Sequence, residues 1–190
     1  MSRPVPNPFQ TITPNEFIVI ENHYATSNNF TRKKLEGYVW GQLWIHKDAY
    51  ASLCQIIECV QKMNLVLVVW DAYRPYRATK QMVDWAYNTG QSYLVEEGYI
   101  AKRSRHNGGV AIDIGLRSAS QYLNLGTEWD DFSEESHTFH AQGEALQNRL
   151  LLQGIMRAHG WVGYEKEWWH FELPNASEYP LFDIPYSTQS

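Results

Sequence analysis

The sequence predicts a single α+β domain. Segments with helical periodicity and segments with strand-like apolar runs alternate irregularly, unlike the regular strand–helix repeat of a parallel α/β fold. The chain has 190 residues, of which 44% are hydrophobic, and this is enough to build one core without disulfides. Because no internal repeat, low-complexity tract or clear linker divides the chain, residues 1–190 are predicted to form one domain.

The first half of the chain is predicted to contain two strands and two helices. Residues 65–70 are an uninterrupted, β-branched apolar run, which is typical of a buried strand. Residues 48–63 repeat apolar side chains at intervals of three and four, which indicates an amphipathic helix. In chain order the predicted elements are an extended Pro-rich arm (1–15), a strand (17–20), a helix (48–63), a strand (65–70) and a helix closed by Gly90 (77–88).

The second half is predicted to alternate strands with irregular segments around one long helix. The strongest signal is the helix, which carries Leu146, Leu150 and Ile155 and ends at Gly160. The predicted elements are a loop (104–109), a strand (110–116), an irregular acidic segment (118–136), a helix (144–159), a strand (167–173) and a Pro-containing tail that wraps the surface (174–190).

Charge and hydropathy argue against two classes of partner. Sixteen Lys and Arg against 21 Asp and Glu give a net charge of −5, with no basic block, so neither nucleic acid nor an anionic membrane is an expected partner. The longest apolar run has six residues, whereas a spanning helix needs about 20. The Pro-rich start lacks the apolar segment of a secretory signal, which favours a cytoplasmic protein, or a periplasmic one if the sequence has been trimmed.

The two cysteines are predicted to be free thiols. Cys54 and Cys59 lie five residues apart in the predicted 48–63 helix. At about 100° per residue their side chains point well apart, so a disulfide between them is not expected. Half-buried thiols of this kind suit a reducing compartment.

A first candidate for chemistry is the segment 104–113. His106 lies in a glycine-bearing loop, and Asp113 interrupts the apolar strand Val-Ala-Ile-Asp-Ile. A buried carboxylate there needs a charged partner or a metal ion. Strand alternation also allows Asp113 to face solvent, because Ala111 and Asp113 share the face opposite Ile112. The residues by themselves leave both readings open.

A second candidate is the segment 165–172, which places Glu167 and His170 among bulky aromatic residues. His106, Asp113 and His170 would supply three zinc ligands and leave one position for water, as catalytic zinc sites do. Glu167 would then take up and return a proton. Residues three apart face opposite sides of a regular strand, so this arrangement requires a bend.

Two further features have competing interpretations. Arg74 follows the buried 65–70 strand, where it would stabilise an oxyanion or hold a carboxylate, or else simply pair with Asp71 at the surface. His137 and His140 have a spacing compatible with two metal ligands, but their acidic, loop-like segment offers no third ligand. We therefore expect no metal at that pair.

Four motifs in order carry a resemblance to a known family. Ser104-x-His106-x-x-Gly109-x-Ala111-x-Asp113, followed by Glu167-x-Trp169-His170, resembles the zinc D,D-peptidases that cut peptidoglycan stem peptides. With Trp70-Asp-Ala-Tyr-Arg-Pro75 and Phe132-Ser-Glu-x-Ser-His137 added, the chain most resembles the VanX-type D-alanyl-D-alanine dipeptidases, from about residue 24 to about residue 182. The resemblance implies zinc-dependent hydrolysis of D-alanyl-D-alanine on a small antiparallel sheet with helices packed against it.

The resemblance also implies a role for each matching residue. One Zn²⁺ per chain would be held by His106, Asp113 and His170, with Glu167 as general base and acid and Arg74 at the tetrahedral intermediate. Groups around the dipeptide would be Tyr24, Tyr38, Ser104 and Asp130, with Met82 on the side-chain pocket wall in place of a Phe. Arg105 stands where a small residue is common, so the size of the pocket is not defined by the resemblance.

Two other functions remain as alternatives. The same metal set serves D,D- and L,D-carboxypeptidases and endopeptidases that act on longer stem peptides, and these need an open cleft. A catalytically inert zinc-containing binding module is the non-enzymatic alternative, but the presence of both Glu167 and Arg74 argues against it. No heptad or evident interface patch indicates an oligomeric state.

Overall fold

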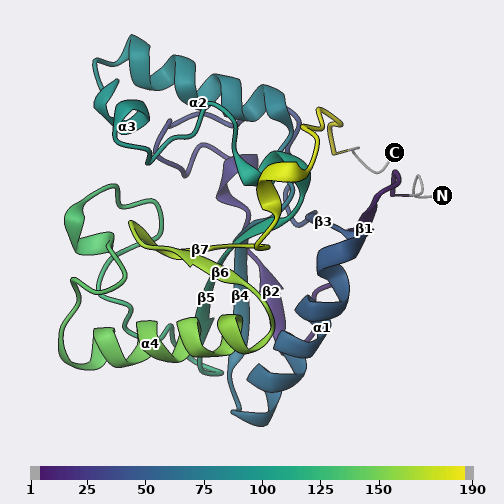
Figure 1. The fold of residues 1–190 in the computed structure, drawn as a ribbon, viewed down its shortest axis with the longest axis vertical. Coiled ribbons are helices and arrows are strands. Elements are labelled where there is room, and N and C mark those ends of the chain that lie inside the picture. Colours follow the sequence, from purple (N-terminus) through teal and green to yellow (C-terminus); the bar gives the residue numbers. More distant parts are fainter. Residues whose placement is uncertain (1–4, 187–190) are drawn as a thin grey trace.

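A five-stranded mixed sheet forms the centre of the molecule in the computed structural model, which describes residues 5–186 (Figure 1). Its spatial order is β2 (Ile18–Ile20), β4 (Val66–Asp71), β5 (Ala111–Arg117), β7 (Glu167–Glu172) and β6 (Val162–Tyr164). All neighbours are antiparallel except β2 and β4, which run parallel. A parallel pair needs a crossover, and here the crossover contains β3 (Trp44–His46) and α1 (Lys47–Lys62).

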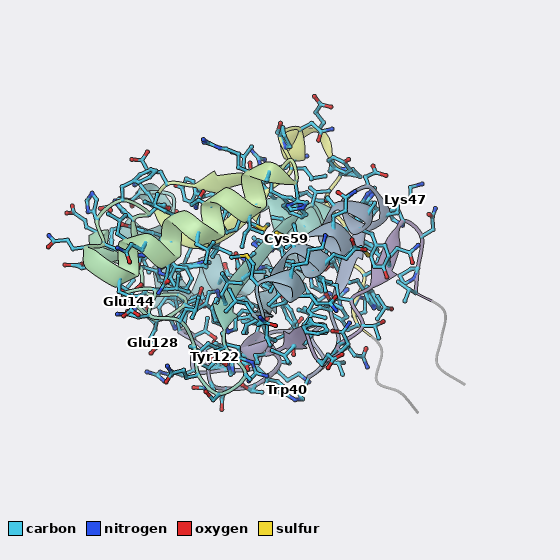
Figure 2. All side chains as sticks on the ribbon, turned by 90° about the horizontal axis from the view of Figure 1, so that it is seen from below. Trp40, Lys47, Cys59, Tyr122, Glu128 and Glu144 are labelled. Atoms are coloured by element: carbon cyan, nitrogen blue, oxygen red, sulfur yellow. The ribbon has the colours of Figure 1, made fainter. Side chains whose placement is uncertain are left out.

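Helices lie on both sides of this sheet (Figure 1). On one side are α1 and α4 (Gly143–Ala158), and on the other are α2 (Tyr76–Asn88) and the short α3 (Tyr93–Glu96). Figure 2 looks onto the α1 and α4 side, where charged residues such as Lys47 and Glu144 project outward. Among residues 5–186, no helix combines the length and hydropathy needed to cross a membrane. The α+β class predicted from sequence is confirmed.

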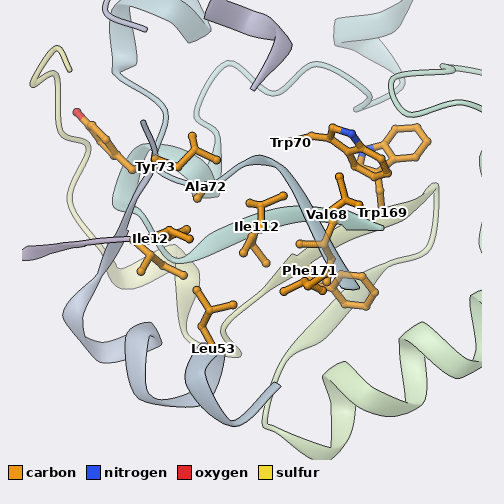
Figure 3. Close-up of a cluster of buried hydrophobic side chains, with 14 of the residues drawn as sticks. Ile12, Leu53, Val68, Trp70, Ala72, Tyr73, Ile112, Trp169 and Phe171 are labelled. Atoms are coloured by element: carbon orange, nitrogen blue, oxygen red, sulfur yellow. The ribbon is translucent and has the colours of Figure 1, made fainter. Parts of the chain in front are cut away.

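The core lies mainly between the sheet and α1. Ile112 of β5, Phe171 of β7 and Leu53 of α1 are almost wholly buried and belong to one cluster (Figure 3). Ile112 and Phe171 pair across β5 and β7 and share one face of the sheet, whereas Asp113 is on the opposite face. Both faces of β4 and β5 are buried, and Asp113 therefore lies in a buried position on the face opposite Ile112.

Four short elements were not predicted from the sequence: β1 (Phe9–Thr11), β3, β6 and α3. Strands of three residues and a helix of four are too short for periodicity to detect. β1 and β3 pair with each other as a separate two-stranded sheet. The predicted loop 104–109 contains a 3-10 turn (Arg105–Gly108), and the irregular 118–136 segment ends in another (Glu134–Ser136).

Both terminal segments pack against the rest of the molecule more closely than the predicted extended arm and surface tail would. Residues 1–4 and 187–190 lie outside the described residues, but Phe9 and Ile12 are buried in the core. At the other end the Tyr186 hydroxyl donates to the Tyr73 carbonyl at 2.6 Å, and the Phe182 N–H donates to the Asn107 carbonyl at 3.0 Å. The tail therefore supports the loop that carries His106.

Cys54 and Cys59 are free and half-buried, as the sequence predicted. Their positions on α1 separate the two thiols around the helix.

Gly115 in β5 is required by close packing. A Cβ atom added there would collide with the ring of Trp70, which stacks on Trp129 with ring centroids 5.8 Å apart. We expect Gly115→Ala to lower the free energy of unfolding by about 1–3 kcal/mol, measured by denaturant titration. Gly154→Ala is the matched control, because Gly154 lies in α4 with no atom within 4 Å of the added Cβ, and it should stabilise by about 0.5–1 kcal/mol. Equal effects of the two substitutions would contradict this packing argument.

Candidate functional site

A register shift between β4 and β5 brings two carboxylates together. Val69 pairs with Ile114, but Asp71 pairs with Asp113, so Trp70 is an extra residue in β4. Asp71 and Asp113 are 0% and 2% exposed. The structure thus decides between the two readings of Asp113, because its side chain is turned inward and not to solvent.

Three potential metal-ligating atoms converge at Asp113. His106 Nε2 and His170 Nδ1 lie 3.2 and 3.1 Å from Asp113 Oδ1, and 3.1 Å from each other. Ligand atoms of a tetrahedral zinc site with bonds of about 2.0–2.1 Å are about 3.3 Å apart. The triangle therefore fits a zinc ion that retains one open position.

In His106 and His170, the ring nitrogen that does not face Asp113 already has a hydrogen-bond partner. His106 Nδ1 lies 2.7 Å from the Ala72 carbonyl, to which it donates, and this leaves the Nε2 lone pair free for a cation. His170 Nε2 lies 3.4 Å from Glu172 Oε2, which likewise leaves Nδ1 free. Outer partners of this kind fix the tautomer and orientation of histidine ligands.

The loop carrying His106 is held by a reciprocal cap. The Ser104 hydroxyl oxygen accepts from the His106 N–H at 3.3 Å, and the Ser104 N–H donates to Asn107 Oδ1 at 3.1 Å. Asn107 Nδ2 then donates to the Arg74 carbonyl at 2.9 Å, while the Arg74 N–H donates to the His106 carbonyl at 3.0 Å. The His106 loop and the Arg74 turn therefore form one unit, and the Ser104 O–H remains as a donor at the cavity wall.

Arg74 is buried in the cavity wall and is not a surface residue. Its Nε donates to Asp71 Oδ2 at 2.8 Å, Nη1 lies 3.2 Å from Met82 Sδ, and Nη2 lies 3.8 Å from Asp113 Oδ2. The guanidinium also lies 5.2 Å from the centre of the Tyr24 ring. The ion pair between Arg74 and Asp71 is present, but it is buried, and it orients the Arg74 guanidinium toward the metal-ligand triangle.

Tyr24 and Asp130 are hydrogen-bonded to each other in the wall of the same cavity. The Tyr24 hydroxyl donates to Asp130 Oδ2 at 2.9 Å, and burial raises the pKa of Asp130 well above its usual range. Tyr38 differs from the expectation for a substrate-contacting residue. It is buried, does not line the cavity, and donates to Asp71 Oδ1 at 2.6 Å. Its place beneath the Asp71–Arg74 pair makes it a support for that pair.

An irregularity in β7 resolves the spacing of Glu167 and His170. Gly163 of β6 pairs with Phe171, but the next residue, Tyr164, pairs with Glu167, so three residues of β7 have no partner in β6. The resulting bend brings Glu167 Oε2 to 4.0 Å from His170 Nδ1. Burial raises the pKa of Glu167 to about 8, and a cation bound nearby would lower it again.

The three metal-ligating residues, Glu167 and Arg74 border one cavity of about 460 Å³, together with Tyr24, Met82, Ser104, Asp130 and Glu172. This volume falls in the range of small-molecule sites, about 300–1,000 Å³. Tyr99, Phe132 and Trp169 add apolar walls. Among residues 5–186, the His106–Asp113–His170 set is the sole cluster of three or more side chains with metal-ligand geometry.

The rings of His137 and His140 lie next to each other, but His137 Nε2 is 2.8 Å from the Tyr99 hydroxyl and is therefore already hydrogen-bonded.

The comparison with known families agrees with this geometry. A family whose description is D-ala-D-ala dipeptidase matches residues 7–188. The chain belongs to the D-Ala-D-Ala dipeptidase family. The resemblance drawn from the sequence motifs is thereby confirmed, and the protein is a peptidase.

Individual members of the D-Ala-D-Ala dipeptidase family are similar over most of their length. A D-alanyl-D-alanine dipeptidase of Escherichia coli (strain K12) is 39% identical over 171 residues, which cover 88% of this chain and 85% of the relative. One from Enterococcus faecium is 33% identical over 183 residues, covering 85% and 89%. The solved LdcB LD-carboxypeptidase shares 20% identity with a TM-score of 0.50, covering 71% of this chain and 63% of that one, and this likeness concerns the fold.

Two residues of this dipeptidase-family site, Asn107 and Glu172, were not singled out from the sequence, and Asp71 was considered only as a surface partner of Arg74. Asp71 orients Arg74, Glu172 faces His170, and Asn107 links the two loops. The sequence did contain a signal for Asp71, because a carboxylate that directly follows six apolar residues is expected to be buried and to need a partner. Glu172 and Asn107 had none, since their roles depend on contacts between distant segments.

Proposed function

We propose that the protein hydrolyses D-alanyl-D-alanine to two D-alanines, with one Zn²⁺ per chain held by His106, Asp113 and His170. The main support is the triangle of ligand atoms with edges of 3.1–3.2 Å, set beside the buried Glu167 and Arg74 in one cavity. When bound, zinc lowers the pKa of a water ligand to about 7 and polarises a carbonyl.

The protein groups supply proton transfer and charge stabilisation. Glu167 accepts a proton from the attacking water and delivers it to the leaving amine, which its burial beside His170 suits. The Arg74 guanidinium, held by Asp71, stabilises the negative charge that develops on the carbonyl oxygen.

The remaining cavity groups match the two charged ends of a free dipeptide. Burial raises the pKa of Asp130, but an adjacent substrate ammonium would lower it again, so Asp130 is suited to bind that ammonium as a carboxylate. The Ser104 O–H is a donor suited to the substrate carboxylate. Each small methyl side chain contributes only about 1 kcal/mol, so these terminal contacts carry most of the affinity. Met82 borders the space for a side chain.

The function is tested by comparing two substrates with the zinc-loaded protein. Released D-alanine is measured from D-Ala-D-Ala and from a stem pentapeptide ending in D-Ala-D-Ala, each with a chelator control. We expect chelator-sensitive cleavage of the dipeptide alone. Cleavage of the pentapeptide would instead make the protein a carboxypeptidase, and cleavage of neither, with zinc bound, would leave the binding-module alternative.

Metal binding itself is expected to stabilise the fold. Free Zn²⁺ at about 1,000 times its Kd stabilises the folded state by about 4 kcal/mol, which raises the Tm of a chain of this size by about 10 °C. We expect this shift, measured by calorimetry, in the wild type and in His140→Gln, which lies outside the ligand triangle. His170→Ala should lose most of it, and an unchanged shift in that variant would refute the ligand assignment.

A further inference from the structure

Arg149 is a buried arginine on α4 whose hydrogen bonds reach a distant loop. It is 1% exposed, so its charge needs fixed partners. Its Nε donates to the Leu125 carbonyl and its Nη1 to the His137 carbonyl, both at 2.7 Å. These carbonyls are the first and last of the segment 125–137, so one planar guanidinium holds both ends of that loop.

This loop carries Asp130, the residue that meets Tyr24 in the cavity. Its only regular element is the 3-10 turn at Glu134–Ser136, so side-chain contacts must fix the rest of its backbone. Asp130 has a φ of 62°, in the left-handed region that a non-glycine residue adopts at a cost. A loop with loosened ends would let Asp130 relax away from this conformation.

Further contacts connect the 125–137 loop to β7, the strand that carries Glu167 and His170. The Trp168 indole N–H donates to Thr127 Oγ1 at 2.8 Å, and Thr127 Oγ1 lies 3.2 Å from Ser136 Oγ. The Arg149 guanidinium lies 5.8 Å from the centre of the Trp168 ring, and Trp168 directly follows Glu167. Arg149 therefore sits where α4, the Asp130 loop and β7 meet.

We propose that Arg149 is a positioning residue for substrate binding: by clamping both ends of the 125–137 loop, it holds Asp130 at the place where the dipeptide ammonium binds. The inference deepens the proposed function and rests on it, because Asp130 is the ammonium partner there. Arg149 itself does not border the cavity.

The test compares Arg149→Met and Arg149→Lys with Arg157→Lys, an exposed arginine of the same helix. Lysine keeps the charge but lacks the fork that spans two carbonyls, and it serves as the measured variant if Arg149→Met does not fold. We expect KM for D-Ala-D-Ala to rise about tenfold in both Arg149 variants, with kcat within about threefold of wild type and Arg157→Lys unchanged.

A double-mutant cycle separates positioning from general destabilisation. In an Asp130→Asn background, Arg149→Lys should add less than about twofold to KM, because the residue it positions has already lost its charge. Full additivity of the two effects, or a fall in kcat at constant KM, would overturn the proposal.

Hydrogen exchange keeps the test independent of the substrate assignment. Amide exchange across residues 125–137 should accelerate in Arg149→Lys and not in Arg157→Lys. If the wild type cleaves no D-Ala-D-Ala, the proposed function fails, and the exchange comparison still decides whether Arg149 clamps the loop. Unchanged exchange across 125–137 would refute the clamp.

Discussion

Glu167→Gln is expected to keep its metal and to lose about 10³-fold or more in kcat for D-Ala-D-Ala. Glutamine has nearly the same shape, so the packing around this 8% exposed position should survive. It cannot accept a proton from water or return one to the leaving amine. Glu167 Oε2 lies 4.0 Å from His170 Nδ1, farther than the 3.1–3.2 Å between the three ligand atoms, and Glu167 is not part of the metal-ligand cluster. Zinc content should therefore stay near one per chain.

The measurement pairs steady-state kinetics with metal analysis on the same sample. Glu165→Gln is the matched control, since Glu165 is exposed two residues earlier in the chain, and it should behave as wild type. Near-normal turnover of Glu167→Gln would remove Glu167 from the proton-transfer role. Loss of zinc together with activity would instead make it part of the metal site.

Arg74→Ala is expected to lower kcat by about 10²-fold or more, in line with the loss of one oxyanion donor elsewhere. The guanidinium is the positive charge that Asp71 holds beside the Asp113 carboxylate. A change confined to KM would indicate that Arg74 binds the ground state of the substrate and does not stabilise the transition state.

The same substitution should also destabilise the fold, because it leaves Asp71 buried without its cation. Breaking a buried pair in this way costs about 3–5 kcal/mol. Adding Asp71→Asn to Arg74→Ala should recover part of the lost stability without restoring kcat, which separates the two effects. Arg77→Ala, three residues on, removes a surface pair with Asp183 and should change kcat little.

The local pattern was sufficient for the longer elements of the fold. The predicted helix at 48–63 is α1 (Lys47–Lys62), and the predicted strand at 65–70 is β4 (Val66–Asp71). Both carry strong apolar patterns, and periodicity over this length reports which face is buried. The parallel pairing of β2 with β4 left no such signal, because strand partners are chosen by packing between distant segments.

Sequence alone determined the secondary structure of the long elements, the family, and the residue types that the chemistry needs. Tertiary structure decided where those residues point. The extra residue Trp70 places Asp71 opposite Asp113, and the unpaired stretch of β7 brings Glu167 to His170. Tyr38 lies beneath Arg74, and Arg149 reaches a loop that begins 24 residues earlier. Register shifts and buried hydrogen bonds depend on how separate segments pack together, and no local run of residues encodes that geometry.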